Sequence, residues 1–134
     1  MRILSLDWGE VRIGGAYSDE EEKFAFTLKK PLDAKTAVSE IKKIVEERKV
    51  EKLLIGNPKS LSGEKSLSSQ KVLRFIEKLK KEITVPIEMF DERFSTVAAS
   101  KMLKDQGFSE KKQRQMKDNL VAQIMLQTYL DNQH

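Results

Sequence analysis

The order of strand-like and helix-like segments is the feature that most limits the fold of this chain. Three strand patterns come first, at residues 2–8, 12–18 and 23–29, and only short segments connect them. Strands with such short connections pair as antiparallel hairpins. The first thirty residues therefore predict an antiparallel meander, with the acidic segment at residues 19–22 as a solvated turn.

Helices and strands alternate through the rest of the chain. The patterns predict two strands, at 52–56 and 86–92. They predict four helices: one capped by Asp33 and ending near residue 48, one at 65–82, one from Ser95 to Gln106 followed by Gly107, and one at 114–131. Alternation of this kind indicates parallel pairing through right-handed crossovers. We expect one α/β domain over residues 1–134, a five-stranded mixed sheet with helices on both faces.

Composition limits the chemistry that this domain can perform. The chain has no cysteine, and its one histidine, His134, is the last residue. A disulfide, a thiolate metal site and a histidine-based triad are therefore excluded. Lysine and arginine total 25 against 21 acids, a net charge of +4 that permits nucleic-acid binding without requiring it. With no membrane-spanning run and no export signal, we expect a cytoplasmic protein.

Three acids fall where an α/β sheet collects ligands, at the carboxyl ends of strands. Asp7 ends the first strand, Glu92 ends the last, and Asp118 opens the final helix. Each also has a purely structural interpretation: a turn former at Asp7, a surface ion pair between Glu92 and Arg93, and a favourable charge at a helix start for Asp118. Val121, Ala122 and Met125 share a helix face with Asp118, which favours a position near the sheet.

Carboxylates that converge at one end of a sheet repel each other unless a cation lies between them. Mg²⁺ prefers hard oxygen ligands, and a pair of such ions about 4 Å apart can activate water against a phosphodiester. This chemistry needs neither histidine nor cysteine. Asp91 and Glu92 are adjacent in extended backbone, so only one can face the site, and the pattern leaves that choice open.

Several cations could contact the phosphates of a nucleic acid. The candidates are Arg12, Arg93, Lys59, Arg114 and Lys117. Each could equally be a solvated surface charge, and we favour that interpretation for Lys59. The paired glycines at residues 14–15 predict a bulge or a close backbone approach, which we interpret as backbone left bare for a phosphate.

Four blocks of the sequence match one family in order. The segment "DWGEVRIG" resembles the D-x-G-x-x-R-I-G opening of the YqgF (RuvX) family, a branch of the RNase H-like superfamily. Similarly, "IGNPKSLSG" resembles its G-x-P loop, "DERFST" its D-E-R-x-T-T signature, and "DNLVAQIMLQTYL" its final helix. Ser95 and Val121 depart mildly from these patterns and leave the acids intact.

The resemblance implies an RNase H-like fold and a nuclease site that depends on Mg²⁺ or Mn²⁺. Carried over by position, the acids of that family fall on Asp7, Glu92 and Asp118, which resolves the choice at residues 91–92 in favour of Glu92. Two roles are ascribed to the family: processing of the 5′ end of pre-16S ribosomal RNA and resolution of Holliday junctions. Structured RNA is therefore the expected substrate, with four-way DNA junctions as the alternative.

Two other functions compete with this expectation. The opening block also resembles the first phosphate-binding turn of actin-like ATPases, but those proteins enclose a nucleotide between two domains and this chain provides one. A non-catalytic RNA-binding factor could keep the fold without turnover. The residues leave open whether the protein is a monomer or a homodimer, although a homodimer would suit a two-fold junction.

Overall fold

The structure is a computed structural model that describes residues 1–57, 67–91, 107 and 109–133. For residues 57, 67–69, 91, 110–118 and 133 the description covers the backbone alone. Glu92, Arg93, Lys59 and the predicted helix from Ser95 to Gln106 lie outside the described residues.

A mixed sheet forms the centre of the domain. Its strands are β1 (Arg2–Asp7), β2 (Arg12–Ser18), β3 (Ala25–Thr27), β5 (Val50–Asn57) and β6 (Ile87–Asp91), in the spatial order β3-β2-β1-β5-β6. The β1–β2 and β2–β3 pairs are antiparallel, whereas β1–β5 and β5–β6 are parallel. The predicted antiparallel meander followed by parallel strands is therefore confirmed. A two-residue strand, β4 (Leu32–Asp33), also pairs with β2 and was not predicted.

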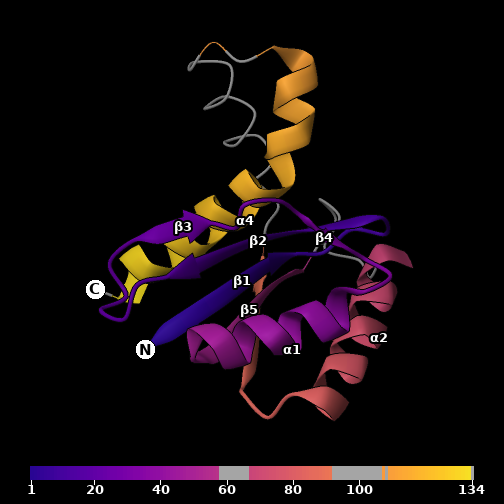
Figure 1. Ribbon diagram of the computed structural model, residues 1–134, viewed down its shortest axis with the longest axis vertical. Coiled ribbons are helices and arrows are strands. Elements are labelled where there is room, and N and C mark those ends of the chain that lie inside the picture. Colours follow the sequence, from indigo (N-terminus) through magenta and orange to yellow (C-terminus); the bar gives the residue numbers. More distant parts are fainter. Residues whose placement is uncertain (58–66, 92–106, 108, 134) are drawn as a thin grey trace.

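Helices cover both faces of this sheet, as predicted (Figure 1). The helices α1 (Ala37–Arg48) and α2 (Leu67–Glu82) lie on one face, and α4 (Glu110–Gln133) crosses the other. The strand side chains divide accordingly. In β1, Leu4 and Leu6 are buried with the α1 and α2 core, whereas Ile3 is buried with Met125 and other residues of α4. This alternation is the two-residue period of a strand buried on both faces.

Several element boundaries differ from the sequence predictions, and side-chain hydrogen bonds account for two of the differences. The third strand begins at Ala25 because a carboxylate oxygen of Asp19 accepts the amides of Lys23 and Phe24, at 2.8 and 2.9 Å, which holds those residues in a turn. Asp33 does not cap α1. It pairs with Arg12 in β4 and accepts the Lys35 amide at 2.9 Å. The residue that precedes α1 is Thr36.

Other elements differ in length. The last helix begins at Glu110 and ends at Gln133, longer at both ends than the predicted 114–131, and β5 is likewise longer than the predicted 52–56. Gly107 has a φ of 81°, a left-handed conformation that favours glycine. Across the described segments, no helix is both long and apolar enough to cross a membrane.

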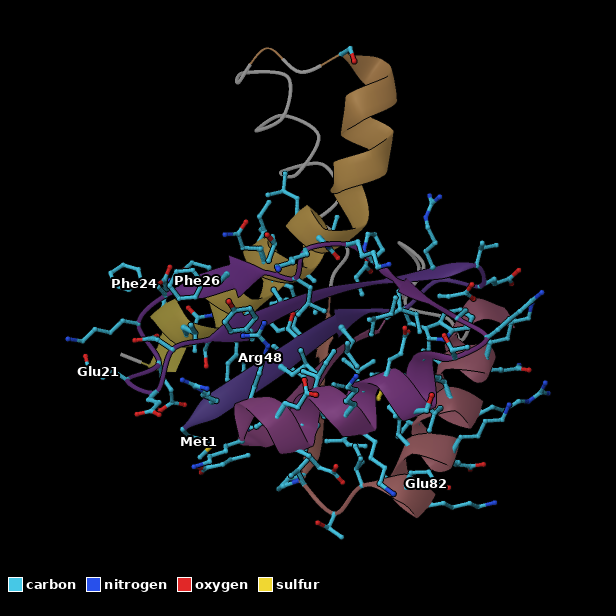
Figure 2. The ribbon with its side chains drawn as sticks, in the orientation of Figure 1. Met1, Glu21, Phe24, Phe26, Arg48 and Glu82 are labelled. Carbon is cyan, nitrogen blue, oxygen red and sulfur yellow. The ribbon has the colours of Figure 1, made fainter. Side chains whose placement is uncertain are left out.

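The hairpin of β2 and β3 is joined to α1 through an aromatic side chain. The Tyr17 ring lies 5.8 Å from the ring of Phe26, and the Arg48 guanidinium lies 4.0 Å from the Tyr17 centroid. Figure 2 shows Arg48 at the end of α1, with Phe24 and Phe26 along the outer edge of the sheet. A cation held over a ring in this way adds a modest attraction between the helix end and the hairpin.

Candidate active site

The carboxyl ends of three parallel strands meet at one edge of the sheet. Leu6 of β1 pairs with Ile55 of β5, and Asn57 of β5 pairs with Asp91 of β6. Asp7 is the next residue of β1, so it lies at the same edge as the ends of β5 and β6. This is the edge at which open α/β sheets bind ligands.

Asp7 lies on the face of the sheet that α4 covers. Ile3 and Ser5 both face that helix: Ile3 packs in its core, and the Ser5 hydroxyl donates to the Ala122 carbonyl at 2.6 Å. Because side chains alternate along a strand, Asp7 follows Ser5 on the same face. The Asp7 side chain is half-buried, and its backbone lies opposite Gly14 of β2.

Buried hydrogen bonds hold α4 at this place on the sheet. The Asn119 side-chain oxygen accepts the Gly15 amide at 2.8 Å, and its nitrogen donates to the Leu28 carbonyl at 3.0 Å. Asn119 is 7% exposed, so both bonds are shielded from water. Together with the bond from Ser5 to Ala122, they determine where the helix crosses β1 and β2.

This anchoring sets the position of residue 118 along the sheet. Gln127 contacts Lys23 and Ala25 at the far end of the hairpin, so α4 runs antiparallel to β1. From Ala122 back to position 118 is about 6 Å along the helix axis, and from Ser5 forward to Asp7 is about 6.6 Å along the strand. Both steps lead toward the carboxyl edge. The backbone of α4 at residue 118 therefore lies level with Asp7.

The early start of α4 removes one interpretation of Asp118. The helix begins at Glu110, so residue 118 is more than two turns inside it. Stabilisation of an acid by the helix dipole, and capping of free amides, are limited to the first turn. The prediction that Asp118 opens the helix was wrong, and a capping role is excluded with it.

The close approach predicted at the paired glycines is present at Gly15, but the group that approaches is Leu28, whose amide donates to the Gly15 carbonyl at 3.0 Å. A Cβ on Gly15 would lie 2.3 Å from Leu28 Cδ1, and one on Gly9 would lie 2.4 Å from the Arg12 carbonyl oxygen. The space beside Gly15 is therefore filled by Leu28 and is not open to a phosphate. The pairing of β1 with β2 is also regular through Gly14 and Gly15, so the predicted bulge is absent.

A charged network joins the second half of α4 to β5 and β6. Lys52 forms an ion pair with Glu88, and the Tyr129 hydroxyl accepts a hydrogen bond from Lys52 at 2.5 Å and donates one to Glu88 at 2.8 Å. The hydrogen bond between Lys52 and Glu88 is the main cause of two pKa shifts: it lowers the pKa of Glu88 and raises the pKa of Lys52. The hydrogen bonds of Tyr129 add to both shifts. These contacts form a second attachment of α4 to the sheet.

The structure describes the remaining predicted site residues to different extents. Arg12 begins β2 and is exposed, and Arg114 and Lys117 lie in the first half of α4, where only the backbone is described. Among the described side chains, no group of three acids, histidines or cysteines could hold a metal ion, but Glu92 and the Asp118 side chain are not among them. The roles of Asp7, Glu92 and Asp118 stay a prediction.

Sequence reasoning missed Ser5 and Asn119, the residues that position α4. A signal for Asn119 was present, because asparagine is unfavourable inside a helix unless its side chain has a partner. It stands beside the apolar positions 121, 122 and 125. A polar residue next to an apolar helix face indicates a buried hydrogen bond to another element.

Comparisons with known proteins agree with the fold. A family model described as "RuvX: Holliday junction resolvase" matches residues 1–132. A protein of Desulforamulus reducens named "Putative pre-16S rRNA nuclease" is 40% identical over 134 residues, covering 98% of each chain. A protein of Maridesulfovibrio salexigens with the same name is 37% identical over 132 residues, covering 97% of this chain and 98% of the other.

A solved structure shares the fold at low sequence identity. Fowlpox virus resolvase, determined in complex with its substrate Holliday junction DNA, superposes with a TM-score of 0.62 at 11% identity, covering 99% of both chains. The likeness to a resolvase confirms the predicted class of fold. With a family model that spans almost the whole sequence, and relatives that match it from end to end, the chain belongs to the RuvX family.

Proposed function

We propose that the protein is a nuclease that uses Mg²⁺ or Mn²⁺ to hydrolyse phosphodiester bonds in structured RNA. The observation that carries this proposal is the placement of α4, whose residue 118 lies level with Asp7 at the edge where β1, β5 and β6 end. The names of the relatives support a nuclease and point to pre-16S ribosomal RNA as its substrate.

The donor set suits a hard divalent cation. Asp7, Glu92 and Asp118 would hold it through carboxylate oxygens, the ligands that Mg²⁺ and Mn²⁺ prefer. A bound ion would supply an activated water and stabilisation of the charge on the phosphate. Arg12 and Arg93 would orient the phosphate, and Lys59, Arg114 and Lys117 would contact the backbone of the nucleic acid.

Cleavage by the purified protein tests the assignment of the acids. Wild-type protein with Mg²⁺ or Mn²⁺ is expected to cut precursor ribosomal RNA, whereas Asp7→Asn loses at least about 100-fold in rate, because a neutral amide is a poor ligand for the cation. Asp131→Asn is the matched control, since Asp131 is exposed near the far end of α4. Equal cleavage by wild type and Asp7→Asn contradicts the proposal.

A second substrate has independent support. The matching family is described as a Holliday junction resolvase, and the fowlpox protein of similar fold was determined with such a junction. A synthetic four-way junction therefore belongs in the same assay. If the wild-type protein cuts the junction in preference to precursor ribosomal RNA, and Asp7→Asn does not, the same site resolves DNA junctions and does not process RNA.

A further inference from the structure

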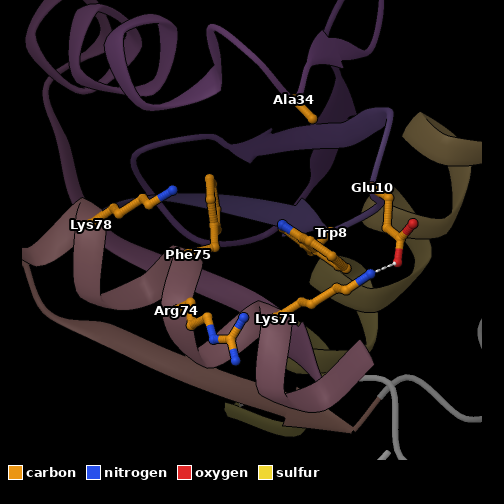
Figure 3. A pocket seen from close by; sticks show the side chains of 7 residues that line it. All are labelled: Trp8, Glu10, Ala34, Lys71, Arg74, Phe75 and Lys78. Atoms are coloured by element: carbon orange, nitrogen blue, oxygen red, sulfur yellow. Dashed lines mark hydrogen bonds and ion pairs between the residues drawn. The ribbon is translucent and has the colours of Figure 1, made fainter. Parts of the chain in front are cut away.

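A pocket of about 350 Å³ lies between the turn after β1 and the helix α2 (Figure 3). It is lined by Trp8, Glu10, Ala34, Lys71, Arg74, Phe75 and Lys78. Its volume is within the range of pockets that bind small organic ligands. None of its residues is among the acids and cations that the proposed function uses.

Aromatic side chains form the apolar part of the pocket. Trp8 is half-buried and packs against the core under α1 and α2, and Phe75 is 8% exposed. Figure 3 shows the indole of Trp8 at the centre of the pocket, with Phe75 beside it. A tryptophan held by packing on one side and open on the other offers a rigid flat surface to a planar ligand.

The polar part of the pocket carries an excess of positive charge. Lys71, Arg74 and Lys78 follow one another at helical spacing on α2, so they form a single stripe. Lys71 forms an ion pair with Glu10 across the pocket. Within the part of the chain that the structure describes, Arg74 and Lys78 have no acidic partner, which leaves two cations to bind an anion.

The pocket is adjacent to the proposed catalytic edge. Trp8 directly follows Asp7, so their Cα atoms are about 3.8 Å apart. Trp8 packs with the core of α1 and α2, whereas Asp7 lies on the face that α4 covers. A nucleic-acid strand that crosses this edge of the β-sheet could therefore contact the acids with one nucleotide and the pocket with the neighbouring nucleotide.

We propose that this pocket binds an unpaired nucleotide of the nucleic acid, beside the bond that is cut. The base stacks on Trp8, and a phosphate of the same strand lies between Arg74 and Lys78. The inference rests on the proposed function, and it identifies single-stranded sequence next to the cleavage point as a feature of the substrate. An acidic peptide would use the two cations but gain little from the tryptophan, so the combination favours a nucleotide.

Trp8 is the only tryptophan of the chain, so its fluorescence reports occupancy of the pocket directly. The probe is single-stranded oligoadenylate, titrated without divalent cation so that no cleavage occurs. Polyphosphate of matched charge, which lacks bases, and polyglutamate are the comparison ligands. We expect oligoadenylate to quench Trp8 and to bind at least about fivefold more tightly than polyphosphate, the lower limit for stacking of a base on an aromatic ring.

Variants of α2 separate the pocket from general surface charge. Arg74→Ala and Lys78→Ala should each weaken oligoadenylate binding and reduce the slope of log affinity against log salt by about 0.7, as for one lost phosphate contact. Lys80→Ala is the matched control, because Lys80 is exposed on the same helix and does not line the pocket. Trp8→Leu, which keeps an apolar side chain against the core, should weaken binding at least about fivefold when followed by anisotropy of a labelled strand.

The outcomes distinguish this inference from the proposed function. Equal binding of polyphosphate and oligoadenylate, tighter binding of polyglutamate, or an equal effect of Lys80→Ala and Arg74→Ala overturns the nucleotide pocket. Cleavage that depends on Asp7, with no quenching of Trp8, supports the nuclease function and overturns the nucleotide pocket. Quenching that depends on Arg74, with no cleavage of any substrate, leaves the pocket and removes the nuclease.

Discussion

Asn119 connects three elements with one side chain. Its amide accepts a hydrogen bond from Gly15 of β2 and donates one to Leu28, just beyond β3, while its backbone belongs to α4. Both partners are main-chain groups that have no access to water at this place. A buried main-chain group that loses its partner costs more free energy than the bond itself contributes. This residue therefore controls both the stability of the fold and the position of residue 118.

Replacement of Asn119 by alanine should lower the free energy of unfolding by about 2 to 4 kcal/mol, because two buried groups lose their partners. Urea unfolding followed by circular dichroism measures this difference. Thr128→Ala is the control, since the Thr128 hydroxyl is exposed and bonds only to the Ile124 carbonyl of its own helix. A loss below about 1 kcal/mol, or a loss that Thr128→Ala equals, would show that α4 is held mainly by its apolar contacts.

At the scale of elements, α4 is attached to the sheet at two places along its length. Ser5 and Asn119 hold the part near the carboxyl edge, and the network of Lys52, Glu88 and Tyr129 holds the second half. Between them lie buried apolar residues, among them Ala122 and Met125. Two separated attachments fix the direction of the helix between Asn119 and Tyr129 as well as its position on the sheet.

The second attachment predicts a defined pH dependence. The pKa of Glu88 is below its ordinary 4.5 in the folded chain. The contribution of Glu88 to the free energy of unfolding is therefore present above pH 4.5 and is lost as the pH falls through the folded pKa. The pKa of Lys52 is above its ordinary 10.5, so its contribution is lost only as pH rises through the higher folded pKa. The stability difference between wild type and Glu88→Gln should be constant in the neutral range and shrink in acid below about pH 4.5.

Thermal unfolding of both proteins from pH 3 to pH 8 measures this dependence. Glu51→Gln serves as the control, because Glu51 is an exposed neighbour of Lys52 in the same strand and is not part of the network. The effect should be small, since Glu88 is about half exposed and surface ion pairs are screened by water. A difference that stays constant down to pH 3 would mean that the carboxylate charge of Glu88 contributes nothing.

The elements themselves could be predicted from the sequence, because apolar periodicity reports them directly. Strand β2 and the end of α1 were placed correctly, since alternation and helical spacing are local signals. The start of β3 and the residue before α1 were misplaced because side-chain hydrogen bonds of Asp19 and Asp33 set them. The contact of Asn119 with Gly15 joins residues 104 positions apart, and no local pattern reports such a partner.

At the scale of the whole molecule, the proposed function requires that acids far apart in the chain meet at one edge of the sheet. Asp7 lies at that edge, and the backbone of α4 at residue 118 lies level with it because Ser5 and Asn119 anchor the helix on the sheet. Strand β6 ends at the same edge with Asp91. We expect such an arrangement to cost stability when no cation is bound, because like charges repel. A bound cation would restore that stability. The stability of the protein should therefore respond to divalent cations in a way that depends on Asp7.

We expect Mg²⁺ or Mn²⁺ to raise the Tm of the wild-type protein, with about 2.7 kcal/mol of added stability at 100 times the dissociation constant. The variant Asp7→Asn should be more stable than wild type in chelator, by roughly 1 kcal/mol or a few degrees in Tm, because one of the repelling charges is gone. It should gain little from either ion. Asp131→Asn should behave as wild type in both conditions, since Asp131 lies at the other end of α4. If all three proteins respond equally to the cations, the metal binds elsewhere. Only a site that includes Asp7 predicts that Asp7→Asn is more stable in chelator and gains little stability from the cation.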